Sequence, residues 1–371
     1  MKKLAWVGLD VHQESIEIAV VDRKDRILYQ GGCSADIEAV VKVLKKFRGY
    51  QLYCCYEASG AGYILQRGLE KRGYDCEVIA PSLIPKQPGV RVKTDKRDAL
   101  KLARFSRGGI LTAVHIPTEQ EETDRSLVRG REQIVGDVKR VKLQILSVFR
   151  HRGWNYRTAV KKENASYWTG LHRKWIRLKL LEITDRGLKF MLDEQLSRLE
   201  YLEGRLERYD EEILTLAREK RYHKKVSSLS CLRGVDVLTG MVLATELGDT
   251  RRFEHPRPLM SYLGLGVKES SSGKKRNQTQ LTKTGNSRVR RVLMEAAQYA
   301  RNPVRVSKAL KQRRVGCDTK LVDIADKCMD RLNRKYWRLA HRGKHTNKIK
   351  GAVAREMVGF IWDILKTVQA A

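Results

Sequence analysis

Four carboxylates in the first hundred residues have the types and spacing to hold divalent cations. Asp10 and Glu57 each follow a run typical of a buried strand, and Asp95 and Asp98 stand three positions apart. That spacing places two side chains on one face of a helix, which Thr94 or Asp95 can cap. Clustered carboxylates repel one another unless cations bind, and Mg²⁺ (or Mn²⁺) suits a few carboxylates plus a substrate phosphate. Two such ions would stabilise the attacking and leaving oxygens in phosphodiester chemistry.

Each of these acids also has a plainer interpretation. Taken singly, Asp98 is typical of a solvated helix residue and Glu57 of a strand-end cap. Taken together, on strands of this order and in a strongly basic chain, the four acids favour a metal site.

A second group of residues places serines beside basic side chains. Ser271 and Ser272 precede Gly273, and the stretch 268–291 holds eight basic residues with only Glu269 acidic. A hydroxyl in such surroundings can attack a phosphodiester, whereas the alternative is a flexible phosphate-binding loop with serines as solvated filler. Phosphate contacts position a duplex without reading its sequence. The predicted nucleic-acid-binding residues are Lys274, Lys275, Arg276, Lys283, Arg288, Arg290 and Arg291.

A sheet must bring the four acids together. Helical spacing marks residues 36–47, and Gly60 and Gly62 are expected to open a second helix. Three early strands followed by alternating helix and strand predict an α/β domain, a mixed sheet with helices on its faces. Carboxylates at the ends of adjacent strands and on a nearby helix then converge at one sheet edge. The predicted strands are 4–9, 15–21, 26–30, 51–56 and 75–80.

From residue 119 the apolar pattern changes to a seven-residue repeat. Two stretches of this kind, joined by a connector, predict an antiparallel coiled-coil arm. The connector, roughly 150–180, is basic and aromatic. The repeating positions are Leu127, Ile134, Val141 and Val148, and then Leu192, Leu199, Leu206 and Ile213.

After Lys225 the sequence resembles a helix-hairpin-helix, whose glycine-bearing turn presents backbone N–H groups to phosphate. Asp236 follows Gly234 where a second glycine is usual, which weakens phosphate binding and makes a packing role at least as plausible. We therefore expect three domains: a metal-binding α/β domain at 1–118, the arm at 119–225, and a mainly helical, serine-bearing domain at 226–371.

The charge of the chain predicts a polyanionic partner. Among 371 residues, Lys and Arg number 75 and Asp and Glu 43, so the net charge is +32. Residues 1–100 carry only +4 of this surplus. Nucleic acid is the commonest polyanion to neutralise such a chain, and a merely soluble or ribosome-adjacent basic protein is the plainer alternative.

Several classes of protein are disfavoured. No run of 18 apolar residues is present, so no membrane span is expected. Asp10 and His12 interrupt the apolar start, which argues against a signal peptide. The seven scattered cysteines fit a reducing cytosol, and we expect a cytoplasmic protein.

Three N-terminal motifs resemble a known family. Residues 8–12 (Gly-Leu-Asp-Val-His), 56–60 (Tyr-Glu-Ala-Ser-Gly) and 93–99 (Lys-Thr-Asp-Lys-Arg-Asp-Ala) are similar to the RuvC-like DEDD domain of a bacterial insertion-sequence transposase family. Its members are described as bridge-RNA-guided recombinases. The resemblance implies a ribonuclease H-like fold and gives the metal-ligand role to Asp10, Glu57, Asp95 and Asp98.

The resemblance extends to the C-terminal part. Residues 271–273 and 282–286 are similar to the signature of the family's serine-bearing transposase domain. This implies that Ser272, with Ser271 as the fallback, attacks DNA and forms a phosphoserine link. Segment 342–362 looks like the family's C-terminal helix, whereas the arm matches only in kind.

The family also implies the partners. These are double-stranded donor and target DNA, a structured guide RNA encoded by the element, and further copies of the chain, as a homodimer assembling to a tetramer. The first rival is a RuvC-type Holliday-junction nuclease that uses water and no serine. The second is a non-enzymatic nucleic-acid-binding protein, which the presence of all four acids disfavours.

Overall fold

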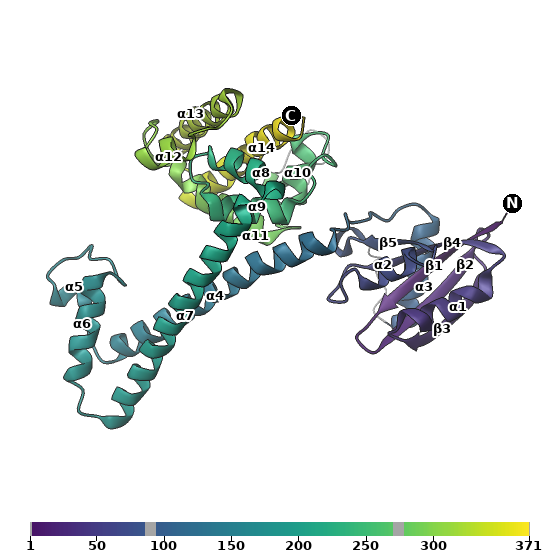
Figure 1. Cartoon of the computed structure of the whole chain (residues 1–371), viewed down its shortest axis with the longest axis horizontal. Coiled ribbons are helices and arrows are strands. Elements are labelled where there is room, and N and C mark those ends of the chain that lie inside the picture. The colour runs from purple at the N-terminus through teal and green to yellow at the C-terminus, as the bar shows by residue number, and fades with distance from the viewer. Residues whose placement is uncertain (1, 86–93, 270–277, 371) are drawn as a thin grey trace. The chain divides into compact units, whose positions relative to one another are not determined.

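The computed structural model describes residues 2–85, 94–269 and 278–370. The chain divides into two compact units, 1–118 and 119–371 (Figure 1). Each unit is described by itself below. The three predicted domain ranges stay predictions.

The first unit is built on a five-stranded mixed sheet, as predicted. The strands lie in the order β3-β2-β1-β4-β5, with β1–β2 and β2–β3 antiparallel and β1–β4 and β4–β5 parallel. The three early strands form the antiparallel part because short turns connect them, whereas helices separate the later strands. The strands are β1 (Lys3–Val11), β2 (Ser15–Asp22), β3 (Ile27–Ser34), β4 (Tyr50–Glu57) and β5 (Asp75–Ile79).

Helices cover both faces of this sheet. Helices α1 (Ile37–Leu44) and α2 (Ile64–Glu70) pack on the face to which β1 contributes Ala5, Val7 and Leu9. Helix α3 (Asp95–Arg107) packs on the opposite face, where its alanines meet Ala19 and Val21 of β2. Alternate residues of a strand point to opposite faces, which explains the two separate cores.

Two of the predicted boundaries that differ in the structure lie beside the predicted acids. Strand β1 continues to Val11, so Asp10 lies inside its strand rather than after it. Helix α2 begins at Ile64 and not at the glycines, because Gly62 has a φ of +64°, which ends a turn rather than opening a helix. The carbonyl oxygen of Gly62 accepts a hydrogen bond from the Tyr56 hydroxyl at 2.9 Å, which fixes this turn beside β4.

The second unit begins with two long helices, α4 (Glu119–His151) and α7 (Arg186–Arg218), which lie side by side (Figure 1). They are antiparallel, since the start of α4 meets the end of α7 through the Arg131–Asp210 ion pair. The far end of α4 packs with the start of α7 in one apolar cluster. The repeat positions Ile134, Val141, Val148, Leu192 and Leu199 belong to this cluster. The coiled coil itself stays a prediction.

The connector between these helices folds around a histidine. It holds the short helices α5 (Tyr156–Ala159) and α6 (Gly170–Leu181). His172 is fully buried, and its ring lies 4.6 Å from that of Tyr156 and 5.9 Å from that of Trp175. Tyr156, Tyr167, Trp168 and Trp175 of the connector thus pack around this histidine.

The remaining helices form a bundle around α14, whose buried side chains join one large core. The Trp362 indole N–H of α14 donates to the Phe253 carbonyl at 2.8 Å. Within the described residues, no helix is long and apolar enough to cross a membrane. The elements are α8 (Lys220–Ser230), α9 (Val237–Leu247), α10 (Pro256–Tyr262), β6 (Val267–Glu269), β7 (Gln278–Leu281), α11 (Ser287–Ala297), α12 (Lys308–Arg313), α13 (Thr319–His341) and α14 (Thr346–Ala370).

Candidate functional site

A glycine brings helix α3 to the carboxyl end of β1. A Cβ on Gly8 would lie only 2.0 Å from the carbonyl oxygen of Ala99. Helix and strand therefore touch backbone to backbone, on the face that Gly8 shares with Asp10 two positions later. Asp95 and Asp98, in the first turn of α3, are carried to the same end of the strand. Thr94 is the N-cap residue, as predicted, but its side chain makes no capping hydrogen bond.

Glu57 stands at the same edge of the sheet. Leu9 and Tyr56 are partners in the parallel pairing of β1 and β4, so Asp10 and Glu57 occupy the next positions of two adjacent strands. Cys55, two residues before Glu57, packs against Leu102 of α3. Glu57 is therefore on the α3 face, with its side chain exposed.

Within the described residues, Asp10, His12 and Asp95 form a group of possible metal ligands. One ligand atom from each lies within 4.8 Å of the others. The Nε2 atom of His12 is 3.4 Å from Asp10 Oδ2 and 3.6 Å from Asp95 Oδ1. The negative charge of Asp98 also acts on Asp10 and raises its pKa. The structure thus brings Asp10, Asp95 and Asp98 together and places Glu57 on the neighbouring strand.

The electrostatics of Asp10 fit a cation-binding role. Burial raises the pKa of Asp10, and the charges of Asp98 and Asp95 raise it further, whereas His12 opposes them. A divalent cation would remove both penalties because it replaces lost water and neutralises the crowded carboxylates. Carboxylate oxygens are ligands that Mg²⁺ and Mn²⁺ accept. The donor set present here therefore fits a divalent metal.

His12 is a residue of this group that the acidic pattern does not reveal. It follows Asp10 by two positions, and that interval was the available signal because alternate strand residues share a face. Its imidazole bridges the strand acid and the helix acid.

The serine group falls largely outside the described residues. Ser271, Ser272, Lys274, Lys275 and Arg276 belong to 270–277 and have no described structure. Antiparallel strands β6 and β7 flank this stretch.

The segment that follows β7 is held by a close backbone approach. Gly285 has a φ of +76°, and a Cβ there would lie 1.9 Å from the carbonyl oxygen of Tyr262. A Cβ on Gly264 would meet the Thr284 carbonyl oxygen at 2.0 Å. Both positions therefore require glycine, and they hold the segment after β7 against the end of α10.

Three of the arginines predicted to contact phosphate already have partners in the protein. Glu132 of α4 pairs with Arg288 at 2.7 Å and with Arg291 at 3.0 Å. Arg290 donates to the carbonyl oxygens of Leu263 at 2.8 Å and Thr284 at 3.2 Å. These arginines thus help hold α11 and the segment before it, whereas Lys283 is exposed, at a φ of +56°.

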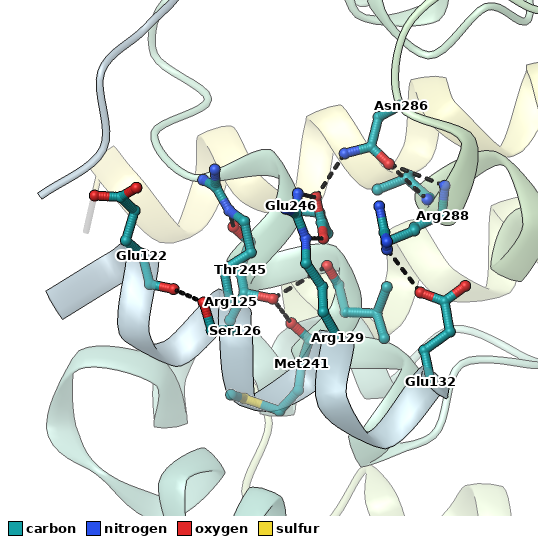
Figure 2. Close-up of polar contacts among 12 residues, drawn as sticks. Glu122, Arg125, Ser126, Arg129, Glu132, Met241, Thr245, Glu246, Asn286 and Arg288 are labelled. Atoms are coloured by element: carbon teal, nitrogen blue, oxygen red, sulfur yellow. Dashed lines mark hydrogen bonds and ion pairs between the residues drawn. The ribbon is translucent and has the colours of Figure 1, made fainter. Parts of the chain in front are cut away.

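A buried carboxylate connects this region to α4 and α9. Figure 2 shows Arg129 and Asn286 directed at Glu246, whose side chain is 1% exposed. Arg129 donates to both oxygens at 2.7 and 3.0 Å, and the Asn286 amide donates at 2.7 Å. Burial alone would raise the pKa of Glu246, but these hydrogen bonds and the Arg129 charge outweigh it and lower the pKa. Asn286 also caps α11 through the N–H groups of Arg288 and Val289.

Two family models match the chain. Residues 7–151 match an IS110-type DEDD transposase domain, and residues 226–312 match the transposase domain of the IS116/IS110/IS902 family. The four strand and helix acids lie in the first range. Residues 264–290, with the glycines described above, lie in the second.

Whole-length relatives agree with these matches. A putative transposase of Sinorhizobium fredii is 35% identical over 98% of this chain and 88% of its own length. The transposase for insertion sequence element IS1533 of Leptospira borgpetersenii is 32% identical over 93% of this chain and 99% of its own. The transposase for insertion sequence element IS1111A of Coxiella burnetii is 23% identical over 80% and 78%. The DEDD domain implies a divalent metal site. On these matches, the chain belongs to the IS116/IS110/IS902 family of transposases.

Proposed function

We propose that this chain is the DNA transposase of an insertion element, which cuts and rejoins DNA through a magnesium or manganese site and a serine nucleophile. The observation that supports this most is the convergence of Asp10, Asp95 and Asp98, with His12, at the carboxyl edge of the sheet. Its DNA substrate would place the protein in the bacterial cytoplasm, at the nucleoid.

Asp10, Glu57, Asp95 and Asp98 would hold the metal. When bound, a divalent cation stabilises the oxygens that gain negative charge during phosphodiester exchange. The protein's own part is to hold the carboxylates charged and oriented. His12 lowers the pKa of Asp10 through its charge and hydrogen bond, and the Gly8 contact fixes the first turn of α3.

Ser272 would form the covalent link to the DNA strand. Its Oγ attacks a phosphorus, so an Oγ–P bond forms and the P–O3′ bond breaks. The hydroxyl proton leaves the serine, and the departing 3′ oxygen takes up a proton to become a 3′-hydroxyl. Attack of another 3′-hydroxyl on the phosphoserine reverses these steps, which rejoins DNA and frees the serine.

Further copies of the chain and an RNA complete the proposal. We propose a homodimer that assembles to a tetramer and a structured, element-encoded RNA that selects the target by base pairing. The charge of residues 101–371, which carry +28 of the +32 surplus, supports a polyanionic partner.

Trapping the covalent intermediate tests the serine step. The full chain is incubated with Mn²⁺, RNA from cells carrying the element, and end-labelled donor DNA, and label that stays on the protein after denaturation is measured. We expect Ser272→Ala to abolish the labelled protein and Ser270→Ala, a matched change two residues away, to retain it. Retention in Ser272→Ala with loss in Ser271→Ala would move the role to Ser271.

The same assay separates the nuclease rival. A RuvC-type nuclease would still release cut DNA in Ser272→Ala and would never label the protein. For the acids, we expect Asp10→Asn and Glu57→Gln to stop cutting, whereas Asp75→Asn, at the start of β5, retains it. Full cutting by Asp10→Asn would refute the proposed metal site.

Purification from cells that carry the whole element tests the RNA. Sequencing of the copurified RNA should reveal one discrete element-derived species. Its absence would remove the RNA from the proposal and leave the strand chemistry untouched.

A further inference from the structure

A pocket of about 560 Å³ opens between the α8–α9 turn and the segment that follows α11. Arg233, Gly234 and Asp236 of the turn line one side, and Tyr299, Arg305 and Arg313 line the other. Three guanidinium groups thus contribute to one cavity, in the part of the unit where the sequence predicts a helix-hairpin-helix-like turn.

Arg233 is fixed at the pocket without a carboxylate. Its guanidinium donates to the carbonyl oxygens of Asn302 at 3.1 Å, Pro303 at 2.9 Å and Arg305 at 2.5 Å. These acceptors orient the group but leave its positive charge uncompensated. Burial lowers the pKa of Arg233, and the charges of Arg314 and Arg305 lower it further. The fold therefore places positive charges close together here, which costs electrostatic free energy.

Two of the neighbouring cations are also unneutralised. Within the described residues, neither Arg305 nor Arg313 forms an ion pair with a carboxylate, whereas Arg314 pairs with Asp326 at 2.7 Å. The Arg313 guanidinium donates to the Ser230 carbonyl oxygen at 3.1 Å. Arg305 is exposed. The stretch 301–314 contains six basic residues and no acidic one. An anion bound in the pocket would offset this repulsion.

We propose that this pocket binds a backbone phosphate of duplex DNA, an inference that rests on the proposed function. Guanidinium forks match phosphate oxygens, and positions around a pocket allow several to meet one phosphate. The Tyr299 side chain, 46% exposed, adds a hydroxyl of the kind that donates to phosphates. The cations of 301–314 outside the pocket favour a polymer over a single small anion because they continue the same charge.

This assignment also explains the departure at Asp236. Its side chain caps α9 by accepting from the Thr239 N–H at 2.8 Å, so the turn retains its shape without a second glycine. Gly234 keeps a φ of +82°, with its Cα against Ala296 and Tyr299. Arginine side chains then take over the phosphate contact that backbone N–H groups make in the glycine-rich form of this turn.

Opposite charge changes at the pocket provide the test. Arg305→Gln removes an exposed cation, and Asp236→Asn removes the carboxylate while keeping a good N-cap. Arg301→Gln is the matched control, with the same charge change in the same stretch but outside the pocket lining. Affinity of the full chain for a labelled DNA duplex is measured by fluorescence anisotropy across salt concentrations, and circular dichroism checks the fold.

We expect Arg305→Gln to weaken binding about tenfold and to reduce the slope of log K against log salt by about 0.9. Asp236→Asn should strengthen binding, and Arg301→Gln should change it much less than Arg305→Gln. Equal effects of Arg305→Gln and Arg301→Gln would show that the charge of the whole stretch binds DNA without a specific pocket, and would overturn the proposal.

Neutral methylphosphonate linkages, placed one at a time along the duplex, then locate the contact. At one linkage, the methylphosphonate should weaken DNA binding by the wild type and leave binding by Arg305→Gln unaffected. This non-additivity is expected of groups in direct contact. Additive effects at every linkage would overturn the proposal. Millimolar inorganic phosphate that competes at constant ionic strength and only with the wild type would instead identify a free-phosphate site and overturn the DNA assignment.

These outcomes are independent of the catalytic proposal. If Ser272→Ala still exchanges strands while Arg305→Gln binds DNA weakly, the serine mechanism fails and the pocket stands. If strand exchange needs Ser272 and Arg305→Gln binds like the wild type, only the pocket fails.

Discussion

Substitution of Gly8 by alanine should disable the candidate metal site without removing any acid. The added Cβ would lie 2.0 Å from the Ala99 carbonyl oxygen, and ordinary contact begins at 3.4 Å, so the helix must retreat by about 1.4 Å. Ala99 follows Asp98 directly, and Asp95 lies one turn earlier. Metal–ligand distances tolerate shifts of only about 0.2 Å, so the carboxylates of α3 and β1 cannot both stay in place.

Two magnitudes follow from this displacement. Overpacking typically costs about 1–3 kcal/mol and occasionally more, and this contact is with backbone atoms. Misplacement of catalytic groups by about 1 Å costs on the order of a hundredfold in rate. We therefore expect Gly8→Ala to cut DNA at least about a hundredfold more slowly and to need more Mn²⁺ for half-maximal cutting.

The assay is a manganese titration of single-turnover cutting, with circular dichroism to show that the protein is folded. Gly49→Ala is the control, since a Cβ there would meet no atom within 4 Å. A Gly8→Ala protein with the wild-type rate and the wild-type manganese midpoint would show that the approach of α3 to β1 does not position the site.

Three further predictions concern binding and stability. Mn²⁺ at a hundred times its dissociation constant should stabilise the wild type by about 2.7 kcal/mol and Asp10→Asn clearly less, as measured by thermal melting; equal shifts would contradict the metal site. Glu246→Gln should lower the free energy of unfolding at pH 7 by about 2 kcal/mol, whereas Glu295→Gln, at an exposed pair, should not. Because the folded pKa of Glu246 is depressed, its contribution to stability is complete above the unfolded pKa of about 4.3 and is lost as the pH falls through the folded pKa. The variant should therefore lose this acid sensitivity in urea titrations. Burial lowers the pKa of His172 to about 4, so the unfolded chain takes up its proton first as the pH falls from about 6.5 to about 4. That protonation should cost about 3 kcal/mol of stability, a pH dependence that His172→Asn should lack and that would be refuted if both proteins melt alike across this range.

The sheet and its acids were predictable because local pattern decides them. Apolar runs mark the strands, and the parallel pairing of β1 with β4 follows from the helix between them. The strand ends were less predictable, since Asp10 continues β1 through its pairing with Glu17. That pairing depends on a partner strand and not on the residue itself.

The packing between α4, α9 and α11 was not predictable from the sequence. Nothing in the spacing of Arg129, Glu246 and Asn286 relates them, because they meet only through the tertiary fold. The one available signal was a lone glutamate in the otherwise uncharged α9, since a buried charge requires a partner. The same reason explains why Arg288 and Arg291 look like free cations in sequence yet pair with Glu132.

The paired helices α4 and α7 have a consequence for scale. Each has 33 residues without an internal proline, and at about 1.5 Å per residue this amounts to a span of about 50 Å. The α9 residue Glu246 pairs with Arg129, 22 residues before the end of α4. A ligand held at the connector would therefore lie about 33 Å, or about ten base-pair steps of duplex, from one held near α9. The length of the two helices thus sets the distance between these two positions. Seven residues added to both would lengthen the span by about 10 Å and keep the same apolar seam.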